Sequence, residues 1–189
     1  MAKRDLAFLF ILSFLVKSSL AAEPITAKNW PKFAGIEWGS STEVVTKALE
    51  KRGYECEKPK AGKSGKSILF TGMLAGEKAM GVCLFTQSKL EAIRIVYFEG
   101  KFDSDAATFG VKLTKILTKK YGQPLKFSKG IKEQFVWITA DKPSYLPVVL
   151  EINPVKEISV NYSSLAYMRA SEKRIEQDNK QDKKSQKDF

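Results

Sequence analysis

A short helical pattern that occurs twice constrains this chain more than any other feature of its sequence. Residues 45–53 read VTKALEKRG and residues 113–122 read LTKILTKKYG, so the second copy begins 68 positions after the first. Each copy places apolar residues on one side of a helix and ends at a glycine, which commonly terminates helices. Runs typical of β-strands follow each copy. The sequence therefore predicts an α+β fold that contains an internal duplication.

The first predicted helix begins at Ser40, which fits an N-cap with Glu43 as its capping-box partner. Its apolar side includes Val45, and Gly53 ends it. The second helix is expected over residues 104–121, where the spacing of the apolar residues fits a helix that faces a core. The apolar stripe of this second helix consists of Phe109, Leu113, Ile116 and Leu117.

Four strands are predicted after each helix. They are expected at residues 54–58, 68–74, 79–86 and 90–98 in the first half, and at residues 125–128, 134–140, 147–153 and 158–162 in the second. Gly62 and Gly130, which lie in corresponding loops, are also 68 positions apart. We therefore expect two helix-plus-four-strand units, with the halves at about 36–100 and 103–163. They would form one antiparallel sheet with helices on one face, in a domain of residues 33–163.

The N-terminus has the layout of a secretory signal peptide. Lys3 and Arg4 precede an apolar run over residues 6–16, and Ser19 and Ala21 provide small residues for cleavage. A run of this length is too short to span a bilayer, which requires roughly 20 apolar residues. Residues 1–21 are therefore predicted to be removed, and the protein is expected to be periplasmic or secreted. No later stretch is apolar enough to span a membrane.

The segments that flank the predicted domain are polar or rich in proline. Residues 22–32 contain Pro24 and Pro31 and are expected to form an extended leader, because proline disfavours helix. Ser164 is placed to cap a helix, and residues 178–188 contain no hydrophobic side chain. Residues 164–189 are therefore predicted to form a polar helix followed by a disordered tail.

Charge restricts the kind of partner. The formal net charge is +11, and loss of residues 1–21 lowers it to +9, since that segment carries three basic residues and one acidic residue. A basic exported protein meets acidic proteins, anionic lipid headgroups and envelope polymers. Nucleic acid is not expected as a partner, because it is rare outside the cytoplasm.

The two cysteines, Cys56 and Cys83, support opposite predictions. Export favours a disulfide between them. In a simple meander, however, Cys56 would lie on the first strand of its half and Cys83 on the third, which are about 9.6 Å apart. Bridged Cα atoms are rarely more than about 7 Å apart. A disulfide would therefore imply that the strands do not form a plain meander.

Two short segments resemble parts of small bacterial envelope proteins. These are residues 35–40 (GIEWGS), which run into the first helix, and residues 120–124 (KYGQP), which end the second. Over roughly residues 33–162 the chain is similar to the β-lactamase-inhibitor-protein-like fold and to outer-membrane-assembly lipoproteins of the SmpA/BamE type. The resemblance implies a sheet with helices on one face and a protein partner on the other face or its loops. Unlike the lipoproteins, this chain has no lipid-attachment cysteine after the apolar run, and no functional residue is carried over.

Residue types that support catalysis are scarce. The chain contains no histidine, the side chain most often used as a general base near neutral pH and as a zinc ligand. Residues 62–67 (GKSGKS) suggest a phosphate-binding loop, but the motif needs a glycine where Lys60 stands and a helix where a strand is predicted. No catalytic residue, metal site or cofactor is therefore predicted.

A loop rich in lysine is the first candidate binding surface. No acidic residue lies between Pro59 and Ser67, so an anionic partner could bind there. The alternative is a solvated hairpin tip that lysine keeps soluble. The lysines of this loop are Lys58, Lys60, Lys63 and Lys66.

One face of the sheet is the second candidate binding surface. The predicted strands at residues 90–98 and 134–140 are apolar on both faces, so Tyr97, Phe135 and Trp137 could form an exposed aromatic patch. The alternative is that these side chains are buried. The sequence thus predicts a non-catalytic interaction module of the bacterial envelope, which binds a protein or an anionic envelope component. The alternative function is an enzyme that uses carboxylate chemistry on an anionic envelope substrate.

Overall fold

The computed structural model describes residues 25–62, 65–98, 106–140, 142, 145–153, 157–170 and 172–173. The predicted signal peptide (residues 1–21) and the predicted disordered tail lie outside these residues, as does Lys63 of the lysine loop.

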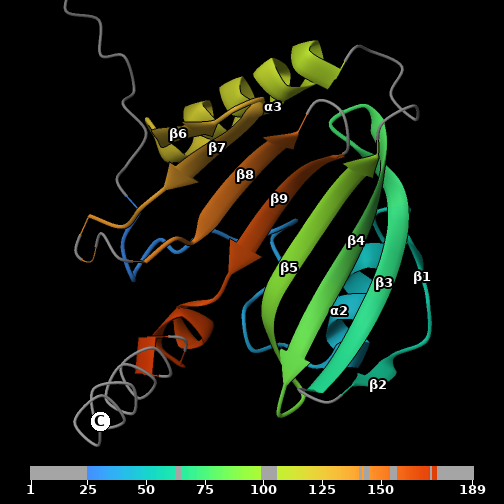
Figure 1. Cartoon of the computed structure of the whole chain (residues 1–189). Helices are drawn as coiled ribbons and strands as arrows, with labels where there is room; N and C mark the ends of the chain where they lie inside the picture. Colours follow the sequence, from blue (N-terminus) through green and yellow to red (C-terminus); the bar gives the residue numbers. More distant parts are fainter. Residues whose placement is uncertain are drawn as a thin grey trace, which may run out of the picture.

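Nine strands form a single sheet in which all neighbouring strands are antiparallel (Figure 1). Their order across the sheet is β1-β3-β4-β5-β9-β8-β7-β6, and β2 pairs with β3 beside β1. The predicted α+β fold with an antiparallel sheet is therefore confirmed. The strands are β1 (Glu55–Cys56), β2 (Lys60–Gly62), β3 (Gly65–Leu74), β4 (Glu77–Thr86), β5 (Lys89–Phe98), β6 (Leu125–Lys129), β7 (Lys132–Trp137), β8 (Val148–Asn153) and β9 (Glu157–Ser163).

Only β2 has no counterpart among the predicted strands. Its three residues are all exposed and lack the apolar alternation that predicts a strand. It forms because the chain folds back along β3, where Lys60 lies opposite Ser67 and Ala61 opposite Lys66.

The two predicted helices are α2 (Thr42–Glu50) and α3 (Ala106–Tyr121). The predicted capping box is wrong, because the N-cap of α2 is Ser41 rather than Ser40 and its side chain makes no capping hydrogen bond. Glu43 consequently occupies the second helical position. The Ser41 hydroxyl instead donates to Glu43 Oε2 (2.7 Å), and this hydrogen bond is the main reason that the pKa of Glu43 is lowered.

Strand register divides the side chains of the sheet into two faces, because residues directly opposite each other point to the same side. The face that we call the core face contains the row Ile68, Cys83, Ile93, Tyr162, Val148 and Trp137. The opposite face, which we call the outer face, contains Leu69, Met80, Val82, Leu84, Arg94, Val96, Phe127, Gln134, Val149, Glu151, Ser159 and Asn161.

One hydrophobic cluster contains buried side chains from both helices and from the core face. From α2 come Val45 and Leu49, each fully buried. From α3, Phe109 packs edge-on against Tyr97 of β5 with 4.8 Å between the ring centroids. The remaining members from α3 are Leu113 and Leu117.

The packed part of the chain begins before Phe33, where the domain was expected to start. Ile25 forms a parallel bridge with Thr139, and the side chains of Ile25 and Trp30 are buried. The Trp30 indole donates to the Ser163 carbonyl oxygen (2.6 Å). Part of the predicted leader is therefore packed on the sheet domain. At the other end, residues 165–170 are helical, and the Ser164 hydroxyl accepts a hydrogen bond from the Tyr167 amide, as expected for a cap.

An aromatic ring covers a glycine in the centre of the first half. Phe70 on β3 lies directly opposite Gly81 on β4, and a Cβ atom at Gly81 would lie 2.0 Å from Phe70 Cζ. Phe70 is also 1% exposed and part of the core cluster. The ring therefore occupies the space that a side chain at position 81 would need, as aromatic residues do over glycines in other sheets.

We expect Gly81→Ala to destabilise the protein by about 1–3 kcal/mol, because the Phe70 ring must leave its position. Gly62→Ala is a suitable control, since Gly62 also has an ordinary φ and a Cβ atom there would meet only the Gly65 carbonyl oxygen, at 3.5 Å. Urea unfolding of both variants measures the difference. Equal free energies of unfolding would contradict this account of the core.

Candidate binding surface on the sheet

The predicted aromatic patch is not exposed. Tyr97 and Trp137 are 2% and 1% exposed and belong to the core face, and Phe135 is partly buried against the same core. The Trp137 indole donates to the Gly122 carbonyl oxygen at the end of α3 (2.8 Å). The expectation that these three residues form an open aromatic face is therefore wrong. Both faces of their strands are apolar, and Val96 and Val136, which belong to the outer face, are buried as well.

The lysine loop corresponds to the β2–β3 hairpin and the residues that precede it. Lys58, Lys60 and Lys66 are exposed. Lys60 forms an ion pair with Glu57 (2.6 Å), and Lys66 lies close enough to Glu43 to contribute to lowering its pKa. Acidic residues outside the loop thus offset part of its charge. Binding of an anionic partner by this loop stays a prediction.

The two cysteines are not joined by a disulfide. Cys56 lies on β1 and Cys83 on β4, and β3 lies between these strands. The prediction of a disulfide from export is therefore wrong for this structure. The strand order instead agrees with the argument that a meander keeps the two cysteines on strands that are not adjacent. Cys83 is fully buried, which raises the pKa of its thiol to about 12. The Cys83 thiol is therefore protonated and unreactive at neutral pH.

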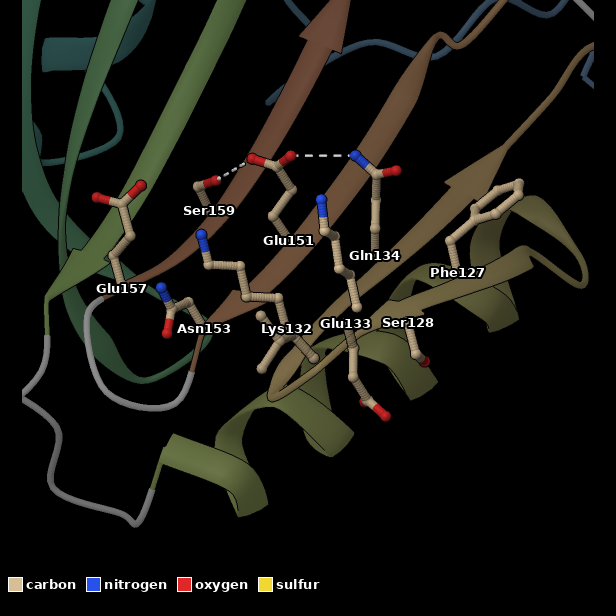
Figure 2. A pocket seen from close by; sticks show the side chains of 11 residues that line it. Phe127, Ser128, Lys132, Glu133, Gln134, Glu151, Asn153, Glu157 and Ser159 are labelled. Atoms are coloured by element: carbon tan, nitrogen blue, oxygen red, sulfur yellow. Dashed lines mark hydrogen bonds between the residues drawn. The ribbon is translucent and has the colours of Figure 1, made fainter.

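A hollow of about 530 Å³ opens on the outer face over β6–β9 (Figure 2). Glu151 lies near its centre, between Gln134 of β7 and Ser159 of β9. The Gln134 amide donates to Glu151 Oε1 (3.0 Å), and the Ser159 hydroxyl donates to Glu151 Oε2 (3.3 Å). Side chains from the two strands that flank β8 thus hold the Glu151 carboxylate in place.

Polar and apolar groups surround this carboxylate. Arg94 of β5 forms an ion pair with Glu157 of β9 (2.7 Å), across the junction between the two halves of the chain. The side-chain amide oxygen of Asn153 (Oδ1) is buried, and the described residues provide no hydrogen-bond donor for it. Lys132 is exposed at the hollow, and Phe127 is 54% exposed. The hollow therefore offers hydrogen-bond acceptors, a cation and an aromatic surface to a partner.

The outer face is more apolar over the first half of the sheet. Leu84 on β4 is 43% exposed, and Leu69, Met80 and Val82 are half-buried. The outer face thus combines an apolar region on β3 and β4 with a polar region on β7–β9. Protein interfaces have this mixed composition.

Sequence reasoning did not identify the residues of this hollow. Glu151 lies in a predicted strand (residues 147–153) and is exposed on β8. Nothing in the sequence, however, indicates that Gln134 and Ser159 lie beside it. Only the β7–β8 and β8–β9 registers bring these three side chains together.

The described residues contain neither a metal-binding cluster nor a membrane-spanning helix. No group of three His, Cys, Asp or Glu side chains is arranged to hold a metal ion. No helix in that part of the chain has the length and apolarity to cross a membrane.

Comparisons with protein-family models, with curated proteins and with solved structures find no match for this chain.

We expect the free energy of unfolding to fall as the pH rises above about 9. Burial raises the pKa of Cys83 from 9.0 to about 12, and it also raises the pKa values of Tyr97 and Tyr162 above 10.0. A raised pKa in the folded state means that the unfolded chain loses its proton first. The contribution of these groups to the free energy of unfolding is therefore fully present below about pH 9. Above that pH it declines by roughly 1.4 kcal/mol per pH unit for each group that ionises only on unfolding.

Urea unfolding between pH 8 and pH 11 measures this decline. Cys83→Val, which has no ionisable group, should show a shallower decline than the wild type between pH 9 and pH 10, where Cys83 is the first of these groups to titrate. If the free energy of unfolding falls equally steeply with pH in the wild type and in Cys83→Val, Cys83 is not the cause of the decline.

Proposed function

We propose that this protein is a non-catalytic interaction module of the bacterial envelope, which binds a protein partner through its outer face. The observation that carries the proposal is the outer face itself, where an apolar region on β3 and β4 adjoins the hydrogen-bonded network around Glu151. Hydrogen bonds and ion pairs already fix the polar side chains of this face. Less conformational entropy is then lost when a partner binds.

The proposal includes an internal duplication, with both helices against the core face. In its support, the buried residues Val45 and Leu49 of α2 and Leu113 and Leu117 of α3 occur at the same offset of 68 positions. Strand order provides a second argument. The order β1-β3-β4-β5 in one half meets β9-β8-β7-β6 in the other, so each half contributes its last strand to the junction.

Export to the periplasm or to the exterior remains part of the proposal and rests on the sequence of residues 1–21. An anionic envelope component bound by the lysine loop is the alternative partner. A binding role fits Glu151 better than carboxylate catalysis. Its side chain is exposed and both of its oxygens already accept hydrogen bonds, whereas a catalytic acid is usually desolvated.

Capture of partners from solubilised envelope, with residues 22–189 as bait, tests this proposal. We expect Leu84→Lys and Glu151→Lys each to reduce capture of a defined protein at least tenfold. The first places a charge in the apolar region, and the second reverses the charge at position 151 and removes the acceptor of Gln134 and Ser159. Val44→Lys and Glu50→Lys are matched controls, since they make the same changes at exposed positions of α2.

Retention after a wash at about 0.5 M salt, where screening is strong, separates apolar contacts from charge attraction alone. Circular dichroism of each variant verifies its fold. If both outer-face variants capture the same protein as the wild type does, the outer face is not the binding surface.

A further inference from the structure

A long stretch of the chain carries positive charge and no negative charge. Between Ala106 and Lys132 there are seven lysines and no aspartate or glutamate, although Asp103 and Asp105 precede the stretch. All seven lysines are exposed. Four belong to α3 and three to the β6–β7 hairpin: Lys112, Lys115, Lys119 and Lys120, then Lys126, Lys129 and Lys132.

The stretch forms one border of the molecule. β6 is the last strand of the sheet, and α3 lies alongside it (Figure 1). A groove between α3 and the β6–β7 hairpin is lined by Val111 and Lys115 from the helix and by Lys126 and Ile131 from the hairpin. We call this border, formed by the exposed side chains of α3 and of residues 125–132, the α3–β6 edge.

Apolar side chains are exposed among these lysines. Within the described residues nine large hydrophobic side chains are exposed, and five of them fall between Ala106 and Lys132. The most exposed of the nine is Ile131 at 59%, and Val111 and Phe127 are each 54% exposed. The other two of the five are Ile116 and Leu125. Exposed apolar surface is therefore concentrated where positive charge is concentrated.

Most of this charge is not neutralised by the protein itself. Lys126 forms an ion pair with Glu133 (2.5 Å), whereas Lys115, Lys119, Lys129 and Lys132 have no acidic partner among the described residues. Lysines on β6 also protect an edge strand from pairing with another chain. That role does not account for the lysines of α3, nor for the exposed side chains of Phe127 and Ile131.

We propose that the α3–β6 edge binds the surface of an anionic phospholipid bilayer. Its lysines lie among the headgroups, and Phe127 and Ile131 enter the boundary with the acyl chains. Basic residues beside exposed apolar ones are the combination that binds such surfaces, since neither signal alone gives stable attachment. Phe127, Lys129 and Lys132 also line the hollow around Glu151, so the edge adjoins the region proposed to bind a protein. Leu84 and Glu151 themselves lie outside the edge, and substitutions at those two positions test the protein proposal separately.

Sedimentation of residues 22–189 with phospholipid vesicles tests the inference. The predicted signal peptide is omitted because its own apolar run would bind lipid. We expect binding to vesicles with about one-third phosphatidylglycerol at about 0.1 M salt, and none to vesicles of pure phosphatidylcholine. Replacing Lys115, Lys119, Lys129 and Lys132 by Gln should lower the partition coefficient at least tenfold, because each lysine near an anionic surface contributes roughly a fivefold factor.

A matched set of substitutions controls for net charge. Lys47, Lys51, Lys78 and Lys89 are also exposed and lie outside the edge, and they form no ion pair with the described residues. Their replacement by Gln therefore removes the same charge. This control should retain most of the binding. Equal loss in both sets, or binding of the wild type to a soluble polyanion but not to vesicles, overturns the proposal.

Phe127→Trp tests insertion directly. Its tryptophan emission should shift to shorter wavelength on anionic vesicles, and lipids with brominated acyl chains should quench it more than they quench the wild type. Of the three wild-type tryptophans, Trp30 and Trp137 are buried and Trp38 is half-buried, and together they provide the background signal. Vesicle binding without this shift and quenching shows that Phe127 stays outside the bilayer and overturns the insertion.

Discussion

The pairing of β5 with β9 is the interaction on which the rest of the structure depends. It joins residues 92–98 to residues 157–163 in register and so connects the two halves of the chain into one sheet. Three core-face residues on each strand are buried at this junction, and burial of each contributes about 1.5–3 kcal/mol. These residues are Ile93, Ile95 and Tyr97 on β5, and Ile158, Val160 and Tyr162 on β9. Without this junction each half would expose a long apolar edge.

The same junction determines what the outer face can do. It places Arg94 beside Glu157 and fixes β9 next to β8, so that Ser159 reaches Glu151. The outer face thus consists of side chains from both halves, and its apolar and polar regions lie on opposite sides of the junction. The α3–β6 edge lies at the far border of the sheet, where β6 has no outer neighbour. The edge adjoins the hollow around Glu151, because Phe127, Lys129 and Lys132 belong to both.

The sequence by itself determined the helices and most of the strands. Apolar periodicity of 3.6 residues predicted α2 and α3, and runs bounded by glycine and polar turns predicted eight of the nine strands. These signals are local, because each depends on residues only a few positions apart. The N-cap of α2 at Ser41 was missed because Ser40 fits the same local pattern, and β2 was missed because its exposed residues lack apolar alternation.

Only the tertiary structure decided which face of the sheet packs against the helices. It also decided which side chains lie together on the outer face. Tyr97 and Trp137 lie in strands that are apolar on both faces, so their burial depends on where α3 packs. Gln134, Glu151 and Ser159 come together through strand register, and a shift of one residue would turn each side chain to the opposite face. Composition determined the charge of residues 106–132. The fold gathers these lysines on one surface, because α3 lies beside the last strand of the sheet.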